Sequence, residues 1–262
     1  KAVTDENEIM MITSGGIIRN VFKYFDTYGR MKVLHKKVDG LIAISTYLQK
    51  YYENKTETIL IPPLVDKSEI KWVKEDFPIT QDKINLVYAG SPAANKDKID
   101  YVISALYNLR GNAYEYSFTV IGLDEKTFIN TYPEVESKYK KIKKNINFLG
   151  RLSHQESLKY VKNADYTIFI RDFSRSTKAG FPTKFVESIS AGTPIITTDT
   201  SDLSNYMNHG YNGIIVKSVN LNEIESSLKT IFQKSFFEIR KSKKQVQADL
   251  FDISNYEKNI EV

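Results

Sequence analysis

Two glycine-containing turns in this sequence carry basic side chains that could bind an anion. The first turn, Gly90-Ser91-Pro92-Ala93-Ala94-Asn95-Lys96, follows an apolar run and precedes a helical pattern. Glycine lets a ligand approach the backbone closely, and a helix amino end beside Lys96 favours a negative group such as a diphosphate. The turn matches neither the Walker pattern nor the dinucleotide-binding glycine pattern. A purely structural strand-to-helix turn therefore remains an equal interpretation.

The second turn opens a helix that carries a lysine and a glutamate on one face. Residues 178–187 read KAGFPTKFVE, and Pro182 suits the first helical position because no N–H is needed there. The backbone N–H groups of such a helix start can bind phosphate. Lys184 and Glu187 share a face, where the cation suits a phosphate and the carboxylate suits ribose hydroxyls. An exposed Lys–Glu pair that stabilises the helix by roughly 0.3 kcal/mol would explain the same spacing.

Other kinds of site find little support in the sequence. Cysteine is absent, which excludes disulfides, thiolate catalysis and cysteine-bound metals. His35, His154 and His209 lack metal-binding spacing, so we interpret each as a surface or loop residue rather than a ligand. Two acids that follow a later strand, Asp199 and Asp202, could hold ligand hydroxyls, although capping of the next helix is the simpler interpretation.

The charge balance permits an anionic ligand or a membrane surface without requiring either. The 262 residues include 37 Lys and Arg against 32 Asp and Glu, a formal net charge of +5. Nucleic-acid binding would rest on this excess alone, because the tyrosines are not interleaved with lysines as a base-stacking platform requires. No apolar run reaches the roughly 18 residues of a membrane-spanning helix, and no signal peptide is evident. We expect a cytoplasmic protein, with peripheral contact at the inner face of the membrane left open.

The elements that must position these turns alternate in type along the chain. Short apolar runs that end in glycine or turn residues alternate with helical patterns, which is typical of a parallel α/β sheet. Ligands of such sheets bind at the carboxyl ends of the strands, where both basic turns would lie. The expected strands are residues 41–45, 58–61, 84–89, 117–122, 147–150, 166–170, 194–198 and 213–216.

Helical spacing and a pair of prolines complete the expected organisation. Ser153 with Glu156 predicts a capping box at the start of one helix. Consecutive prolines at 62 and 63 mark a boundary, because they stiffen an extended connection. Residues 1–64 are too short for a domain of their own, whereas residues 65–262 could form one Rossmann-like domain with terminal helices. The expected helices are 17–38, 46–52, 97–109, 154–163, 181–191 and a basic, interrupted stretch over 221–246.

An ordered series of short motifs resembles the carboxyl-terminal half of family 4 (group 1) retaining glycosyltransferases, which have the GT-B fold. The resemblance extends over residues 38–216 and is specific as a series, although no single motif is. The motifs are VDGLIAIS (38–45), the paired-proline linker (59–66), YAGS (88–91) followed by KD (96–97), NFLGR (147–151), Asn163-Ala164-Asp165, GFPTKFVES (180–188) and GTPII (192–196).

This resemblance implies a nucleoside diphosphate sugar as the donor substrate, with no cofactor. It also implies no metal, because basic side chains and helix amino ends would act on the leaving diphosphate. By the resemblance, Glu187 would hold the ribose hydroxyls, Lys96 the diphosphate, and the backbone of 180–183 the phosphate and sugar, while Arg151 would approach the base. Catalytic residues are not identified. The expected donor-binding set is Gly90, Ser91, Lys96, Arg151, Arg171, Gly180, Phe181, Pro182, Thr183, Lys184 and Glu187.

Two departures from the family pattern affect this set. The usual two glutamates have seven residues between them, so the first would fall at Ala179, which weakens the basis for recognising the sugar. The usual arginine after the first glycine is replaced by Ser91, which thins the diphosphate clamp. Lys178 or Lys184 could compensate, and loss of activity is the alternative.

The resemblance predicts a hexosyltransferase that acts in surface polysaccharide biosynthesis. Its partners would be a nucleotide sugar and a glycan or lipid-linked acceptor. Because residues 1–64 represent only a remnant of an acceptor domain, we expect this chain alone to bind nucleotide but to catalyse poorly. A non-catalytic nucleotide-sugar-binding module is the alternative. An epimerase or a phosphorylase would share the architecture, but cleft carboxylates with histidine, or a cofactor lysine, are not evident.

Overall fold

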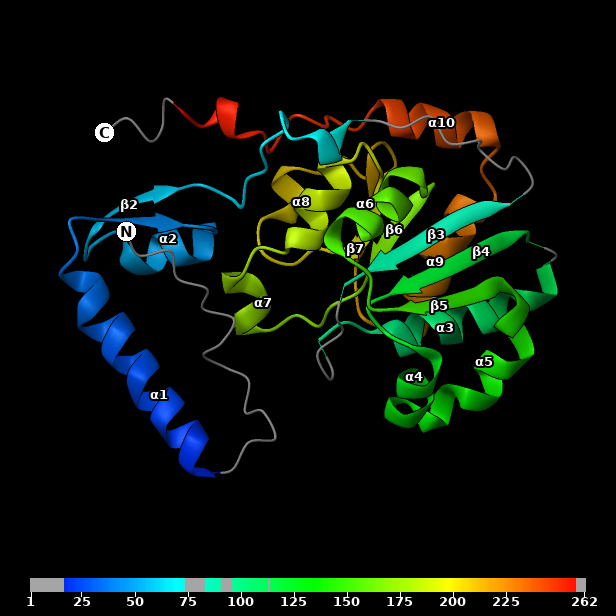
Figure 1. Cartoon of the computed structure of the whole chain (residues 1–262), viewed down its shortest axis with the longest axis horizontal. Helices are drawn as coiled ribbons and strands as arrows, with labels where there is room; N and C mark the ends of the chain where they lie inside the picture. The colour runs from blue at the N-terminus through cyan, green and yellow to red at the C-terminus, as the bar shows by residue number, and fades with distance from the viewer. Residues whose placement is uncertain (1–16, 74–82, 91–95, 113, 258–262) are drawn as a thin grey trace.

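The computed structural model describes residues 17–73, 83–90, 96–112 and 114–257, and its centre is a six-stranded parallel sheet (Figure 1). The strands are β3 (Ile84–Ala89), β4 (Tyr116–Ile121), β5 (Ile146–Gly150), β6 (Tyr166–Phe169), β7 (Ile195–Thr198) and β8 (Gly213–Val216). They lie in the order β5-β4-β3-β6-β7-β8, and every neighbouring pair is parallel. The chain reverses its direction across the sheet between β3 and β6, which creates the crevice where such sheets bind ligands.

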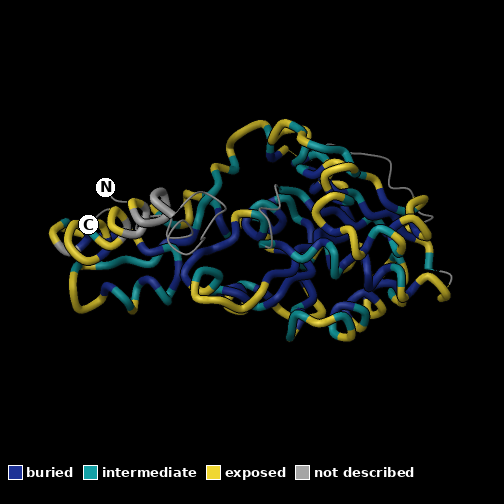
Figure 2. The backbone as a smooth tube through the Cα atoms, turned by 90° about the horizontal axis from the view of Figure 1, so that it is seen from below, coloured by how far each residue is buried: buried dark blue, intermediate teal, exposed yellow. Residues whose placement is uncertain are grey.

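Helices cover both faces of this sheet, so its strands are apolar on both sides. Alternate residues of β3 show the division, because Leu86 and Tyr88 pack with α3 and α9 whereas Val87 packs with Leu158 of α6. Most of the buried residues lie in this part of the molecule (Figure 2). The helices around the sheet are α3 (Ile99–Asn108), α4 (Glu125–Thr131), α5 (Glu136–Ile142), α6 (His154–Asn163), α7 (Arg175–Ala179), α8 (Thr183–Ser190), α9 (Leu221–Phe232) and α10 (Phe236–Lys244).

The amino-terminal part is a separate, smaller unit beside the sheet (Figure 1). Its strands β1 (Gly40–Ala43) and β2 (Glu57–Leu60) form a two-stranded parallel sheet, joined by α2 (Thr46–Tyr52) and preceded by α1 (Ile17–Lys32). Several apolar side chains of α1 and the turn after it are exposed. This group consists of Phe22, Phe25, Tyr28, Val33 and Leu34.

Hydrogen bonds join the amino-terminal part to the edge of the larger sheet. Asp202, in the loop after β7, accepts bonds from the Thr46 backbone N–H at 2.7 Å and from the Thr46 hydroxyl at 2.6 Å. The Ser45 hydroxyl donates to the Ala179 carbonyl at 2.7 Å and also caps α2. The amino end of α2 is therefore fixed against two loops at the carboxyl edge of the larger sheet.

All eight expected strands are present, each within two residues of its expected bounds. The Ser153–Glu156 capping box is confirmed, and the stretch over 221–246 is broken at Ser235, which caps α10. Helix α8 begins two residues later than expected, because Pro182 takes the N-cap position rather than the first helical one. The polar segment after residue 171, where none of the expected helices lies, contains α7, whose start is capped by Ser174.

Two smaller expectations were wrong. His35 is not a surface residue: it is buried, and its Nδ1 lies 2.9 Å from the Tyr52 hydroxyl. Asp202 does not cap the helix that follows it in the chain, because its carboxylate binds Thr46 in the amino-terminal part, as described above. Asp199 does cap the next turn, since its carboxylate accepts from the Ser204 backbone N–H at 3.1 Å.

Candidate functional site

The candidate site lies where β3 and β6 end side by side. Gly90 directly follows β3, and Arg171 lies two residues beyond the end of β6. Lys184 reaches this edge from the first turn of α8. The topology therefore brings together three of the predicted donor-binding residues at the point where the strand order reverses.

A buried carboxylate connects the two cations. Asp97 is 1% exposed, and its Oδ1 accepts a hydrogen bond from Arg171 Nε at 2.5 Å. Its Oδ2 accepts from the Tyr88 hydroxyl at 2.7 Å and lies 2.9 Å from Lys184 Nζ. We call these four residues, Tyr88, Asp97, Arg171 and Lys184, the Asp97 cluster.

The cluster keeps Asp97 ionised. Burial alone would raise the pKa of Asp97, but the Lys184 ammonium and the Arg171 guanidinium, together with the hydrogen bonds from Arg171 and Tyr88, lower that pKa to about 2. Burial, and then the neighbouring Asp97 charge, raise the pKa of the Tyr88 hydroxyl, so it stays protonated and can donate. At neutral pH the cluster therefore holds two positive charges and one negative charge.

The guanidinium of Arg171 is bound on one side. Its side chain is 10% exposed, and within the described part of the chain only its Nε takes part in a hydrogen bond. Its guanidinium carbon lies 5.1 Å from the centre of the Phe169 ring. The Arg171 backbone is held to β7, because its N–H donates to the Thr198 hydroxyl at 3.0 Å and its carbonyl accepts from that hydroxyl at 2.8 Å.

Glycine at position 90 makes room for Lys184. A Cβ atom on Gly90 would lie 2.6 Å from Lys184 Nζ and would collide with Cε, so the lysine side chain passes directly over the glycine backbone. Gly90 also has a φ of +146°, a backbone conformation that residues other than glycine rarely adopt. The Lys184 ammonium lies 5.3 Å from the centre of the Tyr88 ring. The close approach predicted for Gly90 is thus used by a cation of the protein itself.

Glu187 lies on α8 one turn after Lys184 and is paired with a residue that the sequence did not single out. Its Oε1 is 3.1 Å from Nε2 of His154, the first residue of α6, and both side chains are partly exposed. Lys184 and Glu187 line the same small crevice between β3, β6, α6 and α8, with a volume of about 10 Å³. His154 was therefore missed as a site residue, because nothing in the sequence shows that α6 and α8 start side by side.

The segment that leads into α8 contributes backbone rather than side chains. Phe181 is 4% exposed and packs edge-on against Phe185, Tyr206 and Phe251, so its ring belongs to the core and not to a ligand site. Gly180 ends α7, Pro182 caps α8, and the exposed Thr183 opens α8. The first N–H groups of a helix have no partner within it, so this start can still bind an anion.

The remaining predicted residues lie around this centre. Arg151 is exposed and follows β5, the edge strand two places from β3. Lys96 directly precedes Asp97 and is partly buried, whereas Ser91 lies outside the described residues. Ala179, where the resemblance places a glutamate, is 4% exposed and packs against Ala43 and Leu48 of the amino-terminal part.

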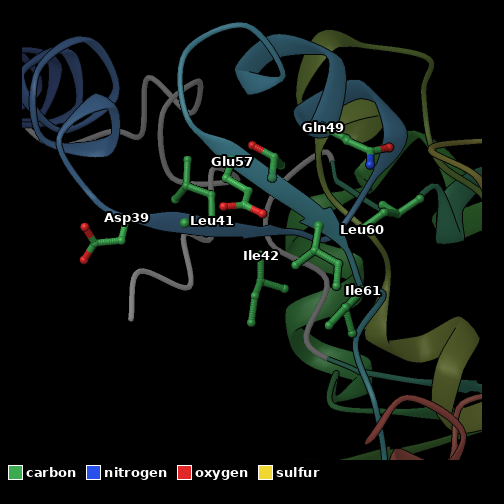
Figure 3. Close-up of a pocket in the computed structure, with 10 residues that line it drawn as sticks. Asp39, Leu41, Ile42, Gln49, Glu57, Leu60 and Ile61 are labelled. Carbon is green, nitrogen blue, oxygen red and sulfur yellow. The ribbon is translucent and has the colours of Figure 1, made fainter. Parts of the chain in front are cut away.

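A larger pocket lies elsewhere among the described residues. It has a volume of about 590 Å³ and follows β1 and β2 of the amino-terminal part (Figure 3). None of its lining residues belongs to the predicted donor-binding set. We therefore assign the candidate site to the strand ends, where the charged groups converge. The lining residues are Asp39, Gly40, Leu41, Ile42, Gln49, Glu57, Thr58, Ile59, Leu60 and Ile61.

The strand order, the glycine turn and the two cations define a Rossmann-type α/β protein with basic side chains at its switch point. The family model described as Glycosyl transferases group 1 matches residues 83–234, so the chain belongs to that family. No curated protein sequence matches the chain.

Solved structures of GT-B glycosyltransferases share this fold. Sucrose-phosphate synthase from Thermosynechococcus elongatus is 14% identical with a TM-score of 0.67, over 98% of this chain and 63% of that one. Anabaena HepE, solved with UDP and glucose, is 13% identical with a TM-score of 0.70, over 90% of this chain and 65% of that one. The pneumococcal O-GlcNAc transferase GtfA, solved with UDP and GlcNAc, is 17% identical with a TM-score of 0.65, over 90% of this chain and 47% of that one. This chain thus spans less than two thirds of the length of these three proteins.

Within the described residues, no helix is long and apolar enough to cross a membrane. No group of three or more histidine, cysteine, aspartate or glutamate side chains that could hold a metal ion occurs in that same part of the chain.

Proposed function

We propose that this chain binds a nucleoside diphosphate sugar and is the donor-binding part of a hexosyltransferase. The observation that carries the proposal is the excess of positive charge on the buried Arg171 and the partly buried Lys184 at the β3–β6 switch point, beside Gly90 and the start of α8. A buried cation without a full complement of anions is costly, and a diphosphate would neutralise it. Membership of the Glycosyl transferases group 1 family supports the same ligand class.

We infer that the nucleotide is UDP. HepE and GtfA were each solved with UDP, and the Staphylococcus aureus protein TarM was solved with UDP and α-GlcNAc-glycerol, at 13% identity and a TM-score of 0.66. In our proposal the diphosphate binds Arg171, Lys184 and Lys96 together with the backbone at the start of α8. Glu187 accepts from the ribose hydroxyls, and Arg151 lies toward the base.

The reaction proposed is transfer of the sugar, with retention of its anomeric configuration, to a glycan or lipid-linked acceptor. Cleavage of the bond between sugar and phosphate leaves negative charge on the diphosphate, and fixed cations stabilise that charge best. Arg171 and Lys184 would do so in place of a divalent metal ion. A role in surface polysaccharide biosynthesis, in the cytoplasm at the inner face of the membrane, is part of the same proposal.

A calorimetric titration of the chain with UDP, GDP, ADP and CMP, with and without EDTA, tests the proposal. We expect UDP to bind best, with no effect of EDTA. Glu187→Ala should weaken UDP binding roughly 10- to 100-fold, since a hydrogen bond to a charged group contributes about 1.5 to 3 kcal/mol.

Glu225→Ala is the matched control for Glu187→Ala. Glu225 is also a helical glutamate, and its carboxylate accepts one hydrogen bond from Asn108 Nδ2 at 2.6 Å. It lies on α9, beside the far end of α3. UDP affinity should be unchanged in this variant. If none of the four nucleotides binds, or if both substitutions weaken binding equally, the donor site proposed here is wrong. UDP binding by the full-length protein without sugar transfer to any acceptor would instead favour a binding module.

A further inference from the structure

We propose that Asp97 is a positioning residue of the nucleotide site, which holds Arg171 and Lys184 so that their remaining N–H groups face a phosphate of the ligand. The inference rests on the proposed function and deepens it. Asp97 was not among the residues expected to bind the donor, and its role would be indirect, because a carboxylate repels a phosphate. It acts through the two cations that it orders.

The hydrogen-bonding capacity of Asp97 is directed into the protein. Its Oδ1 is bound by Arg171 Nε at 2.5 Å, and its Oδ2 is approached by the Tyr88 hydroxyl at 2.7 Å and by Lys184 Nζ at 2.9 Å. With 1% of its surface exposed, Asp97 offers no oxygen to a ligand in solution. A direct contact between Asp97 and the nucleotide is thus excluded by the same contacts that make it an anchor.

The two terminal nitrogens of the Arg171 guanidinium have no hydrogen-bond partner among the described residues. Asp97 binds the inner Nε, which leaves the two terminal nitrogens, and no described residue bonds to them. The side chain is nevertheless nine tenths buried, and its backbone is tied to Thr198 on both sides. The two terminal nitrogens are not among the buried polar atoms that lack a partner, so they reach solvent and are open to a ligand, and a phosphate group suits two parallel N–H groups.

Lys184 is held across Gly90 by the same carboxylate. Its side chain is 17% exposed, and Asp97 is its ion-pair partner among the described residues. A lysine side chain has several rotatable bonds, so without Asp97 the ammonium would leave its place over Gly90 much of the time. Ordering it in advance lowers the entropy that the ligand must otherwise overcome on binding. Asp97 therefore contributes to affinity although it adds a negative charge near the ligand.

The test compares Asp97→Asn with Asp100→Asn. Both remove one negative charge near the start of α3, which Asp97 precedes by two residues and in whose first turn Asp100 lies. Asp100 is outside the Asp97 cluster, and one of its oxygens is buried without a hydrogen bond. The affinities of uridine, UMP and UDP are measured by calorimetry for each variant and for the unaltered chain. We expect Asp97→Asn to weaken UDP binding at least about tenfold and to leave uridine binding unchanged. Asp100→Asn should change neither.

Each result bears on the inference separately from the proposed function. If the unaltered chain does not bind UDP, the proposed function fails. If it binds UDP but Asp97→Asn matches Asp100→Asn, or loses only thermal stability, Asp97 is merely structural and the inference is overturned. Tighter UDP binding in Asp97→Asn also overturns it, because Asp97 would then compete with the phosphate. Should Asp97→Asn not fold, Tyr88→Phe removes one bond to Oδ2 and should weaken UDP about two- to threefold but not uridine.

Discussion

Replacing Ala179 with glutamate should destabilise this molecule, although glutamate is the residue that the family resemblance places there. Ala179 is 4% exposed and packs against Ala43 and Leu48, while its carbonyl accepts a hydrogen bond from the Ser45 hydroxyl at 2.7 Å. A glutamate at this position would carry its charge into the contact between α7 and α2. The departure from the family pattern therefore matches the way in which the amino-terminal part is attached.

Two routes limit the cost of Ala179→Glu. If α2 stays in place, an unpaired buried carboxylate costs about 3 to 5 kcal/mol. If α2 instead moves away, the molecule loses the hydrogen bond from Ser45 and the two from Thr46, about 0.5 to 1.5 kcal/mol each, and re-exposes Leu48, about 1.5 to 3 kcal/mol. The less costly route determines the result, so we expect a loss of about 3 to 5 kcal/mol in the free energy of unfolding.

Urea unfolding at pH 7.5 and at pH 5, followed by circular dichroism, measures this loss. Ala179→Gln introduces the same bulk without charge, and Lys178→Glu introduces a carboxylate at the exposed neighbouring residue. Burial raises the pKa of a carboxylate, so the charge penalty is fully present above that raised pKa and is relieved as the pH falls through it. The difference in the free energy of unfolding between Ala179→Glu and Ala179→Gln should therefore be smaller at pH 5 than at pH 7.5. Equal stability of Ala179→Glu and the unaltered chain at pH 7.5 would refute the packing of α2 over Ala179.

Two further predictions concern groups away from the charged centre. Phe251→Ala should lower the free energy of unfolding, measured in urea, by about 3 to 5 kcal/mol and should weaken UDP binding. The reason is that Phe251 is 0% exposed and packs against Phe181 and Phe185 at the start of α8. Phe237 is 77% exposed, so Phe237→Ala should change neither the stability nor UDP binding. Burial lowers the pKa of His35, so its contribution to stability is complete above about pH 6.5 and is lost as the pH falls below that value. In His35→Asn, the urea midpoint should therefore change less between pH 7 and pH 5 than it does in the unaltered chain. An equal change of the midpoint in both proteins would contradict the burial of this histidine.

Most of the sheet could be predicted because buried parallel strands leave a local signal. Each strand is a short apolar run that ends in a turn, so β3 (84–89) and β8 (213–216) were located to the residue. Helix α7 left no such signal. Its five residues are mostly polar, and its one buried side chain, Ala179, packs against α2, more than a hundred residues earlier in the chain. Local periodicity cannot indicate a face that is covered by so distant a segment.

The cations of the candidate site could be predicted from the sequence, but the contacts that Asp97 and His154 make with other site residues could not. Arg171 and Lys184 stand in turns that the strand-end rule singles out. Asp97 could also have been noticed, because it lies in the turn after β3 among residues predicted to bind an anion. An unpaired carboxylate there would repel the anion, so a cationic partner for Asp97 could have been expected. Its pairing with two cations depends on β3, β6 and α8 meeting in space. The contact between His154 and Glu187 depends in the same way on two helix starts.

Helix α8 shows how remote segments control the proposed nucleotide site. It carries both Lys184 and Glu187, and its amino end rests on Phe251 of the carboxyl-terminal segment. At its other end, Lys67, which directly follows the linker (59–66), donates to the Ser190 carbonyl at 2.6 Å. Linker and carboxyl-terminal segment are themselves joined, since the Val65 N–H donates to the Phe251 carbonyl at 2.9 Å. Because both ends of α8 depend on this joined pair of segments, a shift of the linker would move Lys184 and Glu187 together.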